Sequence, residues 1–272
     1  MQSGCTYNTG LLTVGIDEVG YGPKLGPLVI AAACARARLR TRVRIADSKK
    51  VFSQAKGVRT LEPAVLGFVP AATFAELLDR LGSRVPEAPW YRDSLALPRV
   101  RPLRGLEGAL ARFVEPSEFN ARTRERNKSE FLFEIAADLI RRVRAKHEGP
   151  IRFLVGKHGG RHYYLRGIQQ LISPTVMIVE ETPERSTYQI PGATITFLED
   201  AEDQHRLVAL ASMIGKYVRE CAMKLFNEYW LDRLAGLRRT AGYGSDSRRF
   251  YRQIEGALPK LEIPREAVWR LR

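Results

Sequence analysis

The apolar positions of the chain divide it into short strand-like runs and two long helical stretches. Two apolar runs within residues 11–35 are separated by a glycine-rich turn at 20–23, which predicts a β-hairpin. Shorter apolar runs predict three further strands, at 151–155, 176–179 and 194–198. Apolar side chains that recur every three or four residues predict two amphipathic helices, at 116–147 and 204–230.

Strands that alternate with helices are typical of an α/β fold. We therefore expect one domain over residues 1–272, with a β-sheet flanked by helices and a helical C-terminal region from about 204. Residues 82–104 hold four prolines among several arginines. This composition predicts an irregular surface insertion at about 69–112 of the same domain.

Residues 36–50 carry two polar patterns. Arginine occupies every second position from Arg36 to Arg44, which predicts one face of a strand. That face is either an electrostatic footprint for a polyanion or an exposed sheet edge, and the net charge favours the footprint. The polar turn at 47–50 predicts the start of a helix that rises into residues 61–66.

The charge balance favours a polyanionic partner. The 272 residues include 44 Lys and Arg against 30 Asp and Glu, which gives a formal net charge of +14. Nucleic acid is the first candidate and an anionic membrane surface the second. No apolar stretch is long enough to span a bilayer, and residues 1–8 lack the features of a signal peptide. Three scattered cysteines, Cys5, Cys34 and Cys221, form neither a disulfide framework nor a metal pattern, so we expect a reducing cytoplasm. We also expect a monomer.

Two adjacent carboxylates, Asp17 and Glu18, stand at the end of an apolar strand just before the glycine-rich turn. Hard divalent cations such as Mg²⁺ and Mn²⁺ prefer oxygen ligands, and a pair of such ions can support phosphodiester hydrolysis. A solvated strand end is the alternative interpretation, because acidic dipeptides are common on protein surfaces.

Several ordered motifs favour the functional interpretation. The first motif is the run Asp17, Glu18, Val19, Gly20, Tyr21, Gly22, followed by Gly26 and Pro27. The next two motifs are Asp47, Ser48, Lys49, Lys50 and the segment Pro116 to Asn120. Later come Glu202, Ala211, Ser212, Lys216, Arg219, and the triplet Gly242, Tyr243, Gly244. In order and spacing these motifs resemble the type 2 ribonuclease H family, which comprises ribonucleases HII and HIII. The resemblance covers most of the chain, and residues 69–112 are its least recognisable part.

The resemblance implies a ribonuclease H-like mixed sheet and endonucleolytic hydrolysis of the RNA strand of RNA/DNA hybrids. It also implies two divalent ions, Mg²⁺ or Mn²⁺, held by four carboxylates, of which Asp17, Glu18 and Glu202 match three by position. We carry these three over as catalytic and metal-binding residues. The candidate nucleic-acid contacts are Gly20, Tyr21, Gly22, Lys49, Lys50, Lys157, Arg161, Ser212, Lys216 and Tyr243.

Two departures from the family pattern matter. The family's remaining carboxylate should follow the strand at 151–155, where this chain has Gly156 and then Lys157. Removing a carboxylate and adding a cation there would weaken the attraction for divalent metal. The family's Gly-Arg-Gly turn reads Gly20, Tyr21, Gly22 here, so a preference for single embedded ribonucleotides is less strongly implied than binding of hybrid itself.

Gly156 leaves three interpretations open. Another acid substitutes, the candidates being Glu180, Glu181, Asp200 and Asp203; or the protein binds hybrid without cutting it; or the sequence carries an inactivating change. A further hypothesis is a nuclease of the same fold that acts on another nucleic acid, such as structured DNA. The segment 155–164 is rich in donors able to meet phosphate, and a mobile basic loop is the alternative.

Overall fold

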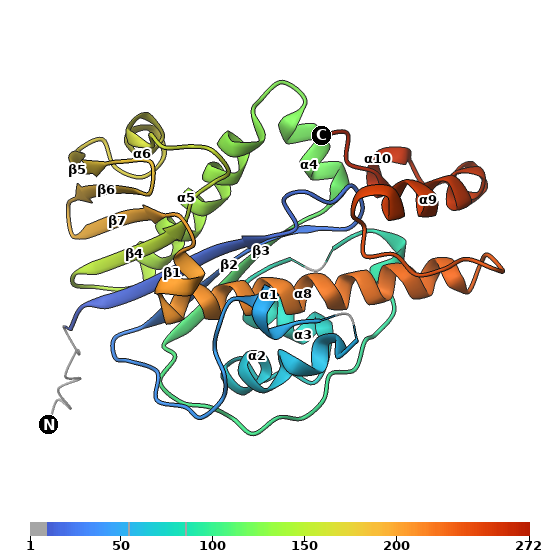
Figure 1. Cartoon of the computed structure of the whole chain (residues 1–272), viewed down its shortest axis with the longest axis horizontal. Coiled ribbons are helices and arrows are strands. Elements are labelled where there is room, and N and C mark those ends of the chain that lie inside the picture. The colour runs from blue at the N-terminus through green and yellow to red at the C-terminus, as the bar shows by residue number, and fades with distance from the viewer. Residues whose placement is uncertain (1–9, 54, 85) are drawn as a thin grey trace, which may run out of the picture.

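A single mixed sheet of seven strands forms the centre of the protein (Figure 1). The computed structural model describes residues 10–272 except 54 and 85. The strand order is β3-β2-β1-β4-β7-β6-β5, with β4 parallel to both β1 and β7 and all other pairs antiparallel. The strands are β1 (Leu12–Val19), β2 (Leu28–Ala35), β3 (Gly108–Val114), β4 (Ile151–Gly156), β5 (Met177–Glu181), β6 (Arg185–Ile190) and β7 (Ala193–Leu198). The structure therefore confirms the predicted mixed sheet and the β1–β2 hairpin.

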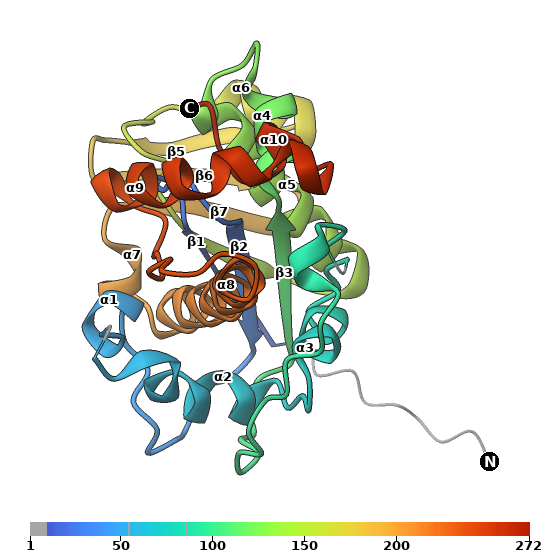
Figure 2. The same ribbon diagram turned by 90° about the vertical axis from the view of Figure 1, so that its right-hand side faces the viewer.

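Helices cover both faces of the sheet (Figure 2). The long helix α8 (Arg206–Leu231) packs on one face and α5 (Lys128–Lys146) on the other, and each belongs to a separate hydrophobic core. The remaining helices are α1 (Ser48–Val51), α2 (Glu62–Phe68), α3 (Phe74–Arg80), α4 (Pro116–Thr123), α6 (Leu165–Leu171), α7 (Ala201–Gln204), α9 (Gly244–Ile254) and α10 (Arg265–Val268), with 3₁₀ turns at Gly57–Thr60, Pro89–Tyr91, Glu255–Ala257 and Pro259–Leu261. This arrangement confirms the predicted flanking helices and the helical C-terminal region.

Helix α8 lies unusually close to β1. A Cβ atom added to Gly15 would stand 2.2 Å from the backbone carbon of Leu207. The absence of a side chain at Gly15 therefore permits this approach, together with the small residues predicted along α8, such as Ala211 and Ser212. One consequence is that α8 passes directly beside the strand that carries Asp17 and Glu18.

The structure corrects three predicted elements. Residues 36–44 form no strand, because the chain leaves the sheet after Ala35 and finds no neighbouring strand to pair with. The helix expected to start at residue 48 ends at Val51, and α2 begins separately at Glu62. The helix expected over 116–147 is divided into α4 and α5, and Asn127 caps the second through a bond from the Ser129 amide (2.9 Å).

The predicted insertion at 69–112 is more ordered than its composition indicates. It includes α3 and the 3₁₀ turn Pro89–Tyr91, and its last residues begin β3, which pairs with β2. Trp90 is 1% exposed, and its ring contacts Phe226 and Trp230 of α8 at centroid distances of 5.2 and 6.5 Å. The part of the proline-rich segment around Trp90 therefore packs onto the α8 core, whereas residues 97–107 form no helix or strand.

Two findings bear on the other predictions. Among the described residues no helix combines the length and apolarity needed to cross a membrane. Cys34 and Cys221 are free and buried, whereas Cys5 and the rest of residues 1–8, on which the signal-peptide prediction rests, lie outside the described part of the chain.

Trp90→Ala should lower the free energy of unfolding by about 3–5 kcal/mol, because it removes a fully buried aromatic side chain from the α8 core. Urea denaturation measures the change. The exposed neighbour Arg92 provides the control, since Arg92→Ala should stay within about 0.5 kcal/mol of the wild type. Equal effects of the two substitutions would contradict a single cooperative domain that includes this segment.

Candidate active site

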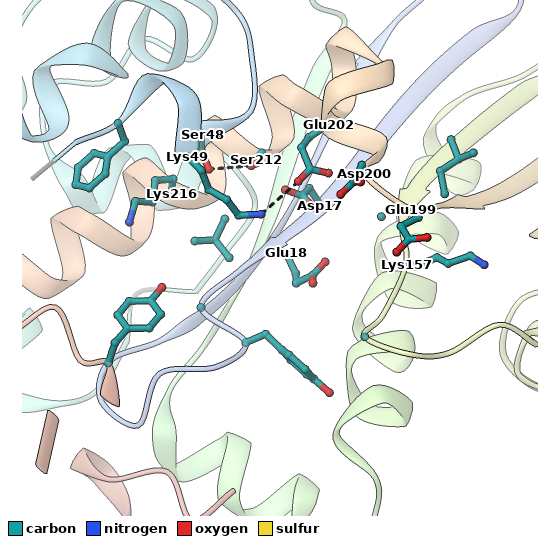
Figure 3. A pocket seen from close by; sticks show the side chains of 18 of the residues that line it. Asp17, Glu18, Ser48, Lys49, Lys157, Glu199, Asp200, Glu202, Ser212 and Lys216 are labelled. Atoms are coloured by element: carbon teal, nitrogen blue, oxygen red, sulfur yellow. Dashed lines mark hydrogen bonds and ion pairs between the residues drawn. The ribbon is translucent and has the colours of Figure 1, made fainter. Parts of the chain in front are cut away.

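A cavity of about 600 Å³ opens at the edge of the sheet where the parallel strands β1, β4 and β7 end (Figure 3). Ile16 of β1 pairs with Val155, and Gly156 of β4 pairs with Leu198, so the residues that follow these positions meet at one edge. Helices α1, α7 and α8 contribute the remaining walls. The lining residues include Asp17, Glu18, Gly20, Tyr21, Ser48, Lys49, Gly156, Lys157, Glu199, Asp200, Glu202, Ser212, Lys216 and Tyr243.

Asp17 and Glu18 lie where burial disfavours the negatively charged form of a carboxyl group. Asp17 is only 9% exposed. Burial, followed by the charge of Glu202, raises the pKa of Asp17 to about 7, and the Ser212 hydroxyl partly offsets this rise. Burial and then Asp17 raise the pKa of Glu18 well above its usual value. A bound cation would relieve this repulsion, so the carboxylates suit a divalent metal ion.

Glu202 faces the same cavity from α7, as Figure 3 shows. Its carboxylate accepts a bond from the Lys49 ammonium at 3.4 Å, and Lys49 also acts on the charges of Asp17 and Glu18. The fold thus brings Glu202 together with Asp17 and Glu18, which lie far from it in sequence. They line the cavity without closing into a compact metal cluster: within residues 10–272, leaving out 54 and 85, no three His, Cys, Asp or Glu side chains form one.

Gly156 occupies the place from which a further carboxylate would reach the site. A Cβ atom added there would lie 3.0 Å from Asp17 Oδ1 and 3.7 Å from Glu18 Oε2. Lys157, in contrast, does not add its charge to the carboxylates. Its ammonium donates to the carbonyl oxygens of Thr182 (3.0 Å) and Pro183 at the β5–β6 turn, pointing away from Asp17 in Figure 3. The expected weakening by a nearby cation is therefore wrong, and only the missing carboxylate remains.

The four acids considered as substitutes have different surroundings. Glu180 pairs with Arg185 at 3.8 Å, Glu181 accepts a bond from the Tyr188 hydroxyl, and Asp203 pairs with Lys50 at 2.5 Å. Asp200 lines the cavity with a positive φ of 47°. Glu199, which sequence reasoning missed, also lines it, and its position at the end of β7 could have revealed it once β7 was placed parallel to β4.

The candidate nucleic-acid contacts divide into two groups. Seven line the cavity: Gly20, Tyr21, Lys49, Lys157, Ser212, Lys216 and Tyr243. The other three do not line it: Gly22, Lys50 and Arg161. Arg161 instead lies 3.9 Å from Glu130 and packs over the ring of Phe133. Ser212 is buried and hydrogen-bonded to Ser48 (3.0 Å), which favours a supporting role beside Asp17.

Within the expected phosphate-binding segment, His158 is part of the core. It is 2% exposed and contacts the rings of Phe133, Tyr164 and Phe197. Burial, followed by the charge of Arg161, lowers the pKa of His158 to about 3. This histidine is therefore neutral and structural, and the expectation that it meets phosphate is wrong.

Two fully buried arginines, Arg219 and Arg270, donate hydrogen bonds to backbone carbonyls in and just after the glycine-rich turn. Arg219 donates to the carbonyls of Pro27 (2.6 Å), Leu25 (3.1 Å) and Ala241 (3.1 Å). Arg219 therefore points into the protein and does not face the nucleic-acid backbone.

Arg270, near the end of the chain, donates to the carbonyls of Gly20 (2.5 Å) and Gly26 (2.7 Å). The carbonyl and the N–H of a trans peptide point in opposite directions. The inward carbonyl of Gly20 therefore turns the Tyr21 amide away from the arginine, and the two guanidinium groups fix how the turn presents its backbone.

The fold and the carboxylate-lined cavity at the strand ends define a ribonuclease H-like α/β protein. A family model described as ribonuclease HII matches residues 14–73, which include Asp17, Glu18 and Lys49. Together with the fold, this match supports the resemblance to the type 2 ribonuclease H family, and the part of the chain that it covers is residues 14–73. Comparison with curated proteins gives no match.

Solved structures support the fold over nearly the whole chain. The PCNA:RNase HII complex from Archaeoglobus fulgidus gives a TM-score of 0.54 at 22% identity, covering 96% of this chain and 94% of that one. The Q54A mutant of Bst-RNase HIII gives a TM-score of 0.50 at 19% identity, covering 97% of this chain and 68% of that one. At these identities the likeness concerns the fold alone.

Arg270→Met should lower the free energy of unfolding by about 2–4 kcal/mol, because it leaves two buried carbonyls of the glycine-rich turn without donors. Urea denaturation gives the value. Arg272→Met is the matched control, since Arg272 makes only exposed bonds to the carbonyls of Arg124 and Arg126, and it should cost well under 1 kcal/mol. A difference too small to measure between the two variants would overturn the fastening role.

Acid should destabilise the protein partly through His158. Its pKa is about 3 in the folded state against 6.5 for the unperturbed group, so the unfolded chain takes up the proton first as the pH falls. This contribution is present above pH 6.5 and is lost between about pH 6.5 and 3. His158→Phe should reduce the loss of stability between pH 7 and 4 by about 1–3 kcal/mol. His147→Phe serves as the control, and an unchanged acid profile for His158→Phe would contradict the assignment.

Proposed function

We propose that this protein is a metal-dependent endoribonuclease that hydrolyses the RNA strand of RNA/DNA hybrids. One observation carries the proposal: buried Asp17 and its partly buried neighbour Glu18 face a cavity that Glu202 also lines. Such an arrangement is costly for the fold unless a cation or a proton balances it. The resemblance to the type 2 ribonuclease H family agrees with this chemistry.

Asp17, Glu18 and Glu202 would hold two divalent ions, Mg²⁺ or Mn²⁺. Such ions supply an activated water molecule and stabilise the charge that develops on the leaving oxygen. Among the chain's own groups, Lys49 balances the charge of Glu202. The backbone at Gly20 and Tyr21 and the exposed ring of Tyr243 would contact the substrate. Lys216 also lines the cavity, and its ammonium pairs with Glu220 at 2.7 Å.

A second candidate function rests on Gly156. Its missing side chain leaves empty the position that would face Asp17 Oδ1 at 3.0 Å, so the site offers one carboxylate fewer than the family pattern. Under this alternative the protein binds hybrid through the same cavity without turning it over. Under both alternatives we propose a monomer that acts on nucleic acid in the cytoplasm, a compartment that the buried thiols of Cys34 and Cys221 suit.

A hybrid-cleavage assay with Mg²⁺ or Mn²⁺ tests the proposal. The wild type should cut the RNA strand, and Asp17→Asn should reduce the rate about 100-fold, equivalent to about 2.7 kcal/mol of transition-state stabilisation. Circular dichroism of the variant provides the control for folding. Intact binding of hybrid by the wild type, with no cleavage at any metal concentration, would contradict the nuclease and leave the binding function.

Gly156→Asp separates the interpretations of the altered site. A gain of about tenfold or more in rate or in metal affinity would show that the wild-type site lacks a needed ligand. In the metal-free protein the added charge should lower the melting temperature, and Mg²⁺ should restore it. Equal rates for Gly156→Asp and the wild type would instead mean that another acid already serves, and Asp200→Asn and Glu199→Gln would then identify it.

A further inference from the structure

Two extended segments remote from the carboxylates hold much of the protein's unbalanced charge. We call their exposed arginines the arginine strip: Arg38, Arg40, Arg42, Arg44, Arg99, Arg101 and Arg104. Across residues 10–272 without 54 and 85, none of these seven side chains has a hydrogen bond, ion pair or aromatic ring as partner. The neighbouring Arg36 differs, because it pairs with Glu107 at 3.1 Å. The strip thus carries seven positive charges, in a chain whose formal net charge is +14.

The backbone beneath the strip is held by apolar side chains. Leu39 is 4% exposed, and Val43, Ile45, Val100 and Leu106 are partly buried against the α8 core. Exposed arginines therefore alternate with more buried residues over 38–44, and in the second segment Arg99 and Arg101 flank the partly buried Val100. The alternating arginines at 38–44 predicted a strand, but the segment is an extended chain that packs on the core without pairing to the sheet.

Contacts between and beneath the segments place them on one side of the molecule. A Cβ atom on Gly105 would lie 3.6 Å from Leu39, and the Leu103 amide donates to the carbonyl of Gly67 in α2 (2.7 Å). The Glu107 amide donates to the carbonyl of Cys34 at the end of β2 (2.8 Å). Figure 1 shows both segments running along the side that carries α2. The arginines accordingly project from a fixed surface.

So many unpaired arginines are unfavourable for the isolated fold. Alternate residues of an extended chain lie about 6.6 Å apart, within the Debye length of about 8 Å at physiological ionic strength, so their charges repel one another. Each guanidinium group offers paired donors that match a phosphate. A polyanion of regularly spaced phosphates would remove the repulsion and engage several arginines at once.

The strip is connected to the candidate active site along the chain. It starts after Ala35, which pairs with Thr13 at the end of β1 away from the cavity, whereas Asp17 pairs with Ala31. Residues 45–48 then lead into α1, where Lys49 lines the cavity. The four residue steps from Ala31 to Ala35 span about 14 Å, which corresponds to about 4 base pairs of duplex. We propose that the arginine strip is a second nucleic-acid surface, which binds duplex phosphates beyond the reach of the cavity.

This inference goes beyond the proposed function, and the strip should bind duplex whether or not the cavity cuts RNA. The test measures affinity for a DNA duplex of about 30 base pairs as a function of salt concentration. It compares two triple variants, Arg38→Gln with Arg40→Gln and Arg42→Gln, and Arg99→Gln with Arg101→Gln and Arg104→Gln. A charge-matched control replaces three exposed arginines that already have ion-pair partners, namely Arg80, Arg141 and Arg185.

Each phosphate contact contributes about 0.9 to the slope of log affinity against log salt concentration, so each strip variant should lower the slope by about 2–3 and weaken binding about tenfold or more. The control should change the slope by less than about 1. Melting temperatures of the strip variants should equal or exceed the wild-type value, because the lost side chains make no contacts.

A short hybrid of about 8 base pairs supplies the second readout. Its binding, and its cleavage if the wild type cuts, should change much less in the strip variants than binding of the long duplex, because a hybrid centred on the cavity extends only about 4 base pairs to either side. Strip variants that match the control on the long duplex would overturn the inference and leave the proposed nuclease intact. Strip-dependent binding by a wild type that never cuts hybrid would overturn the nuclease and leave the inference intact.

Discussion

Helix α8 lies against β1 with no side chain between them at Gly15, and this contact governs the geometry of the cavity. Any Cβ at that position would meet the backbone of Leu207 at 2.2 Å, so the helix could not come as close. The same approach buries Asp17 beside Ser212 and brings Lys216 to the cavity wall. The high pKa of Asp17 follows largely from this burial, because desolvation is its largest cause. The same burial therefore makes the negative charge of Asp17 unfavourable in the fold and favours the binding of a cation beside it.

Local sequence patterns predicted those parts of the fold that depend on local periodicity. The β1–β2 hairpin, α8 and the placement of Asp17 and Glu18 at a strand end follow from runs of a few residues, and the structure contains all of them. The motif order placed Glu202 with them, although 184 residues separate Glu18 from Glu202. Two strands were not predicted: β3, which follows the proline-rich segment, and β6, whose residues are mostly polar.

The remaining errors concern residues whose surroundings come from distant parts of the chain. Lys157 was expected near phosphate, but the β5–β6 turn supplies carbonyls that bind its ammonium. His158 was expected among donors that meet phosphate, but the rings of Phe133, Tyr164 and Phe197 enclose it. The roles of Arg219 and Arg270 were not predicted, because nothing local shows that the carbonyls of the glycine-rich turn will need donors. In each case the partner lies too far away in sequence for periodicity to indicate it.

The bond between Arg270 and Gly20 joins two ends of the folded chain across 250 residues. A protein made from its N-terminus can fold its earlier parts while synthesis continues. The glycine-rich turn, however, receives this donor only after residue 270 has left the ribosome. The wall of the cavity that this turn forms therefore lacks the donor while the residues between Gly20 and Arg270 are being synthesised.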